Sequence, residues 1–191
     1  MAKAIKYSYE ELVEKAQNLF WLKGYKGVSV NELANHLNVS TSIIYNKYSK
    51  DILFLDSLDY YTSNYSDPFL SQLRETTEGL DSLKAFFYSL IDALLDKTFP
   101  KSCLMVNTVV EMRNENQEII DRYNAYFKIL TDSYKVVLEK AFALGQIKDR
   151  SKIEDYSEFL LGVIFGLSIL YKIQDKPSLQ LFVDGQLSFI K

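Results

Sequence analysis

The sequence predicts an all-α fold of about nine helices. Only 7 glycines and 3 prolines occur among 191 residues, too few for the frequent turns of an all-β chain. Apolar residues recur every three or four positions, a spacing that gathers them on one face of a helix. Serine precedes glutamate by three residues at 8–11, 29–32 and 151–154, which is the capping-box pattern that begins a helix.

The first helix is predicted to begin after Ser8 and to end at Gly24, because glycine adopts the left-handed backbone of a helix end at little cost. A second, short helix is expected after Ser29, and Asn38 tolerates the positive φ of the turn that follows. The first helix carries its apolar side chains on one stripe, which comprises Leu12, Ala16, Leu19 and Phe20.

Ser40 is expected to cap a third short helix ending near Tyr48, and Ser49 to begin a fourth that runs to Ser66. Later helices are predicted at 80–97, 103–112, 116–144, 151–173 and 177–190, with Pro100 and Gly145 ending two of them. We therefore predict an N-terminal domain at 6–66 and a larger helical domain at 67–191.

Charge is distributed unevenly along a chain whose net charge is −3. Residues 1–50 carry seven lysines and four glutamates, a net charge of +3, so that the remaining residues carry −6. A basic N-terminal region on an acidic body is suited to binding a polyanion such as nucleic acid.

The rare residue types exclude several classes of site. One cysteine forms neither an intramolecular disulfide nor a cysteine zinc cluster, and one histidine excludes paired-histidine metal sites. No enzyme, metal or cofactor is expected. The most apolar stretch, 159–170, is shorter than the roughly 20 residues that cross a bilayer, and the N-terminus lacks a signal-like apolar segment, so a cytoplasmic protein is expected.

Residues 29–48 have the pattern of a helix-turn-helix, whose second helix enters the major groove of DNA. Apolar side chains would pack the two helices together, while hydroxyl, amide and lysine side chains on the outer face could reach base edges and phosphates. The same spacing occurs in buried helical hairpins that bind no DNA. The candidate DNA-binding residues are Ser29, Ser40, Thr41, Ser42, Tyr45, Asn46, Lys47, Tyr48 and Lys50.

Two runs, AQNLFWLKGYKGVSVNELA at 16–34 and VSTSIIYNKYSKDIL at 39–53, resemble the opening of TetR-family transcriptional regulators. The resemblance covers about residues 7–55. Asn38 and Ser42 stand where the family usually has glycine, and Lys47 stands where histidine is common. Serine in place of glycine at position 42 alters the recognition surface, so the operator sequence is expected to differ from that of other family members. DNA binding itself is still expected.

The resemblance implies a ligand-responsive homodimeric repressor that binds a palindromic operator, with Tyr45, Lys50 and the start of the recognition helix touching DNA. It also implies that the last two long helices pair with those of a second subunit. Independently, apolar residues nearly surround the helix that contains 159–171, and Gly162 and Gly166 would permit close helix approach. Burial of this helix within one subunit is the alternative.

A small-molecule effector with apolar or aromatic character is the third expected partner. The candidate binding residues are Cys103, Met105, Asn107, Tyr123 and Phe127. Aromatic residues at helical spacing equally suit a plain core, and Asn107 could instead bond to a backbone carbonyl.

Cys103 offers a second function, because a helix N-terminus and Lys101 would favour its thiolate and make it a sensor of electrophiles or oxidants. A lone cysteine is also a common small core residue. A helical small-molecule carrier without DNA binding is a further alternative. An enzyme built on Cys103 ranks last, because its only possible histidine partner, His36, falls in the other predicted domain.

Overall fold

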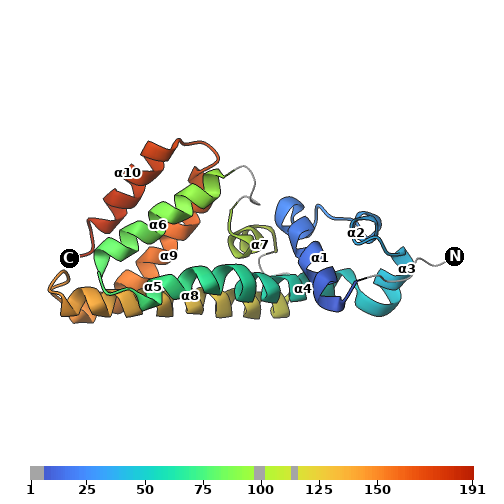
Figure 1. Cartoon of the computed structure of the whole chain (residues 1–191), viewed down its shortest axis with the longest axis horizontal. Coiled ribbons are helices and arrows are strands. Elements are labelled where there is room, and N and C mark those ends of the chain that lie inside the picture. The colour runs from blue at the N-terminus through green and yellow to red at the C-terminus, as the bar shows by residue number, and fades with distance from the viewer. Residues whose placement is uncertain (1–6, 97–101, 113–115) are drawn as a thin grey trace. The chain divides into compact units, whose positions relative to one another are not determined.

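The structure is a computed structural model that describes residues 7–96, 102–112 and 116–191. Every regular element in these ranges is helical (Figure 1). The elements are α1 (Tyr9–Lys23), α2 (Val30–His36), α3 (Thr41–Ile43), the π-helical η1 (Ile44–Tyr48), α4 (Lys50–Tyr61), the π-helical η2 (Thr62–Ser66), α5 (Asp67–Glu75), α6 (Leu80–Leu95), α7 (Leu104–Met112), α8 (Gln117–Ala143), the 3-10 turn η3 (Arg150–Lys152), α9 (Ile153–Leu170) and α10 (Lys176–Leu187). The all-α prediction is confirmed. None of the helices in the described ranges is long and apolar enough to span a membrane.

The chain divides into two compact units. The first comprises the described residues within 1–66 and 103–124, and the second those within 67–102 and 125–191. The first unit therefore includes α7, which comes from a distant part of the sequence. These units describe packing, and the predicted functional domains 6–66 and 67–191 stay a prediction.

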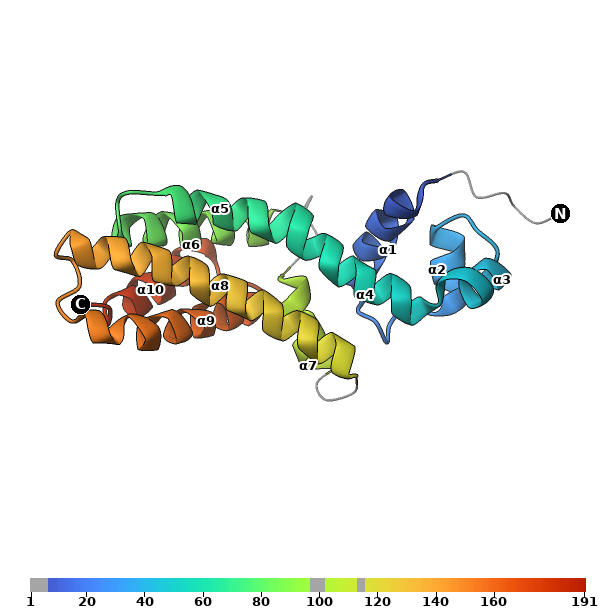
Figure 2. The ribbon, with the colours of Figure 1, turned by 90° about the horizontal axis from the view of Figure 1, so that it is seen from below.

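In the first unit, α1 lies against α4 (Figures 1 and 2). Phe20 of α1 meets Phe54 of α4 edge-on, with ring centroids 5.0 Å apart. At the next position along α1, Trp21 packs against Tyr61 in the same geometry and at the same 5.0 Å separation. Aromatic burial of this kind fixes the helix that precedes the helix-turn-helix segment.

In the second unit, α6 lies against α10 and α9 contacts the same helix (Figure 1). Phe87 and Tyr134 are fully buried and their ring centroids lie 6.0 Å apart. Gly166 of α9 accommodates the Phe182 ring of α10, since a Cβ at this position would lie 2.8 Å from Cζ. The predicted close approach at Gly166 is thus made to a helix of the same chain, whereas a Cβ at Gly162 would meet open space.

Local signals at the N-terminal helices agree with the structure. Ser8 and Glu11 form the predicted capping box, Gly24 ends α1 with φ +74° and Asn38 turns the chain with φ +56°. The predicted box at 29–32 is only half formed, because Ser29 accepts from the Glu32 amide at 3.1 Å but the Glu32 carboxylate pairs with Lys23 of α1.

Other local predictions were wrong in whole or in part. Ser40 is the N-cap residue of α3 as predicted, but its hydroxyl makes no capping hydrogen bond and bonds to Ser42 Oγ at 2.8 Å. The box at 151–154 is absent, because Asp149 accepts from the Ser151 amide at 2.9 Å, so that α9 begins only at Ile153. A helix with Pro68 in its first turn, α5, was not predicted, although proline is tolerated there. The predicted helix end at Pro100 and the neighbouring Lys101 lie outside the described residues.

Candidate nucleic-acid interface

The helix-turn-helix segment is supported by a continuous apolar underside. Leu33, Leu37 and Ile44 are completely inaccessible to solvent, Val39 is buried and Ile43 is half-buried. The turn between the helices is closed by the Val39 amide, which donates to the Ala34 carbonyl at 2.9 Å. Burial of these side chains fixes the angle of the second helical segment against the first and leaves its other face at the surface.

The outer face of residues 41–48 carries the predicted polar side chains. Tyr45 is 70 % exposed, and Ser42, Asn46 and Lys47 are exposed beside it. Ser40, Thr41, Tyr48 and Lys50 are half-buried, and Ser29 is exposed at the start of α2. All nine predicted DNA-binding residues therefore lie in the first unit, with their side chains at least partly accessible.

Tyr48 is part of a small aromatic platform. Its ring stacks on Tyr9 of α1 with centroids 5.1 Å apart, and the Lys47 amine lies 4.9 Å from its ring centroid. The Tyr9 hydroxyl donates to Asp56 of α4, and partial burial together with this carboxylate raises the pKa of Tyr9. The Tyr48 ring therefore lies in contact with both the Tyr9 ring and the Lys47 amine.

Lys50, at the first position of α4, is positioned by Tyr25. Its amine lies 3.9 Å from the Tyr25 ring centroid, while the Tyr25 hydroxyl donates to Asp51. Partial burial lowers the pKa of Lys50, and the Asp51 and Glu111 carboxylates counteract part of this change. An ammonium over an aromatic face is held by the quadrupole of the ring, so the Lys50 charge is ordered before any ligand binds.

The surroundings of Lys50 include two residues that the sequence analysis missed, Tyr25 and Glu111. The Glu111 carboxylate on α7 accepts hydrogen bonds from the backbone amides of Tyr25 and Lys26, at 2.9 and 2.6 Å. Separations of 85 and 86 residues leave no local pattern that could reveal this contact. Tyr25 lies within the run that carries the family resemblance, and its place after the helix-ending Gly24 predicts only a loop.

The predicted effector residues are distributed over both units. Cys103 is half-buried, and the Tyr61 hydroxyl donates to its Sγ at 3.5 Å. Met105 is buried, and Asn107 and Tyr123 are half-buried in the same unit. The remaining residue, Phe127, belongs to the second unit, where its ring packs on Phe165. The assignment of these five residues to an effector site stays a prediction.

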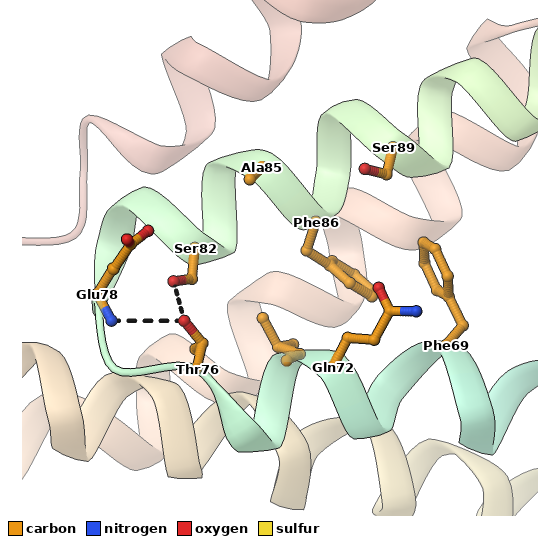
Figure 3. A pocket seen from close by; sticks show the side chains of 9 residues that line it. Phe69, Gln72, Thr76, Glu78, Ser82, Ala85, Phe86 and Ser89 are labelled. Carbon is orange, nitrogen blue, oxygen red and sulfur yellow. Dashed lines mark hydrogen bonds between the residues drawn. The ribbon is translucent and has the colours of Figure 1, made fainter.

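The second unit has a cleft of about 250 Å³ between α5 and α6 (Figure 3). Phe69 and Phe86 face each other at one end, with ring centroids 4.9 Å apart. At the other end the hydroxyls of Thr76 and Ser82 hydrogen-bond to each other. None of the predicted effector residues is among those lining the cleft, which are Phe69, Gln72, Leu73, Thr76, Glu78, Ser82, Ala85, Phe86 and Ser89.

Two family models match the chain. Residues 12–55 match the one described as bacterial regulatory proteins of the tetR family, and residues 79–182, more than half of the chain, match the one described as tetracyclin repressor-like, C-terminal domain. The chain is 24 % identical over 182 residues to the uncharacterized HTH-type transcriptional regulator YezE of Bacillus subtilis, covering 94 % of both chains. It is 23 % identical over 165 residues to the HTH-type transcriptional repressor ComR of Escherichia coli, covering 85 % of this chain and 79 % of that one.

Solved structures share the fold. A cysteine mutant of the TetR family regulator CifR, complexed with 26-bp operator DNA, superposes with a TM-score of 0.84 at 19 % identity, covering 97 % of this chain and 98 % of that one. The reduced form of NemR from E. coli superposes with a TM-score of 0.72 at 16 % identity, covering 92 % and 94 %. The similarity extends over both compact units.

Proposed function

Because this chain belongs to the TetR family of DNA-binding transcriptional regulators, we propose that it is a homodimeric repressor whose operator affinity is controlled by a small molecule. The observation that carries the proposal is the exposed polar face of residues 41–48 above a buried apolar underside. A helix anchored in this way can enter a major groove without unfolding any part of the protein. The solved CifR structure, which shares this fold and is complexed with operator DNA, supports DNA binding by this chain.

The proposed interface separates affinity from sequence recognition. Lys47 and Lys50 carry positive charge and are proposed to contact phosphates, a contact that any sequence offers. Tyr45 and Asn46, together with the hydroxyls of the first turn, are proposed to reach base edges or the adjacent backbone. Ser29 is proposed to contact phosphate at the start of α2.

Dimerisation through α9 and α10 is proposed from exposed apolar side chains. Ile169 and Leu181 are 56 % and 74 % exposed, and Phe159, Ile173 and Phe189 are also exposed on or beside these two helices. Apolar side chains in such number suit a subunit interface.

Light scattering tests the dimer. The double variant Ile169→Glu/Leu181→Glu should show half the molar mass of the wild type, because charged side chains would be buried at the subunit interface. Leu22→Glu, at an exposed leucine of α1, should leave the mass unchanged. An unchanged mass of the double variant would contradict the proposed interface.

The proposed effector is a small molecule with an apolar or aromatic part and hydrogen-bonding groups. The cleft between α5 and α6 offers two phenyl rings at one end and hydroxyls at the other, a combination typical of ligand sites. A thermal-shift screen should identify compounds, and Phe69→Ala and Asn107→Ala then distinguish the cleft from the site predicted by sequence. The variant that abolishes the ligand-induced shift identifies the site, and retention of the shift by both variants would contradict both assignments.

The DNA-binding proposal is tested by selecting bound fragments from genomic DNA and measuring their affinity by fluorescence anisotropy. Lys47→Ala should weaken binding and lower the slope of log affinity against log salt by about 1 for each phosphate that the protein no longer neutralises. Lys128→Ala, which removes an exposed lysine of the second unit, should leave both quantities unchanged. If no fragment binds while a small molecule does, the chain is a carrier and the proposal fails.

A further inference from the structure

The Glu111 carboxylate binds the loop that connects α1 and α2. Its Oε2 accepts from the Tyr25 amide at 2.9 Å and its Oε1 from the Lys26 amide at 2.6 Å. The Lys26 amine in turn donates to the Glu111 carbonyl at 3.1 Å. A carboxylate that accepts two backbone amides is a strong, charge-assisted attachment, and here it joins α7 to the helix-turn-helix head of the first unit.

Gly24 makes this attachment possible. A Cβ on residue 24 would lie 2.6 Å from Glu111 Oε2 and 3.0 Å from its Cδ, closer than van der Waals contact permits. The same residue has φ +74°, which disfavours any other side chain. Glycine at this position therefore serves both the end of α1 and the approach of the carboxylate.

Tyr25 extends the attachment to the first turn of α4. Its amide is bound by Glu111, its ring lies under the Lys50 amine and its hydroxyl donates to Asp51. The ring also packs against Phe54 of α4, with centroids 4.9 Å apart. One residue thus connects the carboxylate on α7 with the lysine that the proposed function assigns to a phosphate.

Charge alone would make Glu111 unfavourable for DNA binding. Its carboxylate is close enough to Lys50 to act on that amine electrostatically, and a negative charge there repels phosphate. Removal of the charge should strengthen DNA binding if electrostatics were its only effect. If Glu111 instead acts by holding the loop in place, removal of the charge should weaken DNA binding. The direction of the change in affinity therefore distinguishes the electrostatic role from the geometric role.

We propose that Glu111 is a positioning residue of the DNA interface: it fixes the loop at 24–26 and, through Tyr25, holds the Lys50 ammonium where it meets a phosphate. This inference rests on the proposed function, since it assigns Lys50 to DNA. It also makes the position of α7 a determinant of operator affinity within the first unit.

The test is a double-mutant cycle of Glu111→Gln and Lys50→Met on a DNA fragment selected by the wild-type protein. Glutamine has the same shape, but it presents an amide N–H₂ to one of the two backbone donors, so that one of the two hydrogen bonds is broken. Glu111→Gln should weaken binding about three- to tenfold and lower the salt slope. In the Lys50→Met background it should have less than about a twofold effect, because the residue through which it acts is gone.

The control is Glu118→Gln, which removes a charge from an exposed glutamate of α8 in the same unit and should leave affinity unchanged or slightly tighter. Tighter binding by Glu111→Gln, or an undiminished effect in the Lys50→Met background, would overturn the inference. If Glu111→Gln does not fold, Glu111→Asp provides the same cycle, because the shorter side chain keeps the charge but cannot reach both backbone amides in the same way. Failure of the wild-type protein to bind any fragment would instead refute the proposed function.

Discussion

Gln17 of α1 offers a direct test of how the first unit is stabilised. Its side chain is completely buried, and neither its amide nitrogen nor its amide oxygen has a hydrogen-bond partner among the described residues. A buried polar group without a partner costs about 1–3 kcal/mol. Methionine has nearly the same length and helix propensity, so Gln17→Met removes this cost without opening a cavity.

We expect Gln17→Met to raise the free energy of unfolding by about 1–3 kcal/mol, which corresponds to roughly 2–4 °C in Tm for each kcal/mol in a chain of this size. Urea denaturation followed by circular dichroism measures the change. Gln174→Met, at an exposed position after α9, is the matched control and should change stability little. A decrease in the stability of Gln17→Met would refute the reasoning, because it would mean that the amide is satisfied in solution.

Three further predictions concern the described contacts. Burial lowers the pKa of Lys50, and its positive charge is lost as the pH rises through that value. Operator affinity should therefore begin to fall at a lower pH than it would if Lys50 had the pKa of an exposed lysine. Anisotropy titrations of Lys50→Arg should show no such fall. The Ser178 hydrogen bonds lower the pKa of the Asp175 cap of α10, so its stabilising effect is fully present above about pH 4 and is lost as the pH falls through the lowered pKa. Asp175→Ala should therefore destabilise at pH 7, and its cost in urea titrations should decrease progressively as the pH is lowered below about 4. Gly166→Ala should destabilise the protein by about 1–3 kcal/mol, because its Cβ would meet the Phe182 ring at 2.8 Å. Adding Phe182→Leu to this variant should restore part of the stability. Equal Tm values for Gly166→Ala and the wild type would contradict this packing.

Signals that act over three or four residues were readable from the sequence. The Ser8 box, the positive φ at Gly24 and Asn38, and the buried underside of 29–48 all follow from one residue and its near neighbours. The box at 151–154 failed for the same local reason, because Asp149, two residues before Ser151, competes for its amide. A capping pattern therefore predicts that a helix is present more reliably than it predicts the residue at which the helix begins.

Contacts between distant segments were not readable. Glu111 lies in a helix whose apolar spacing predicts only a packed element, and nothing in its neighbourhood distinguishes it from a surface glutamate. The effector residues present the same difficulty, since the chemistry of Cys103 and Met105 suggests a ligand site, whereas the cleft between α5 and α6 is lined by other residues, among them Phe69 and Phe86, and the effector assignment stays a prediction. A cleft depends on which helix faces come together, and spacing within each helix does not determine that.

In the proposed DNA complex, a second copy of the chain is expected to be needed for tight binding. One subunit offers two lysines to the proposed interface, the exposed Lys47 and the half-buried Lys50 at the start of α4, so its salt-dependent affinity is expected to rest on few phosphates. In the proposed dimer, two subunits would double these contacts and would read two half-sites about 34 Å apart on one face of DNA. Since each lysine is supported by an aromatic ring, Tyr48 or Tyr25, a shift of either ring acts in both subunits at once. In the proposed dimer, a small movement of the helices that position these rings would therefore have a squared effect on the binding constant, as the proposed ligand control requires.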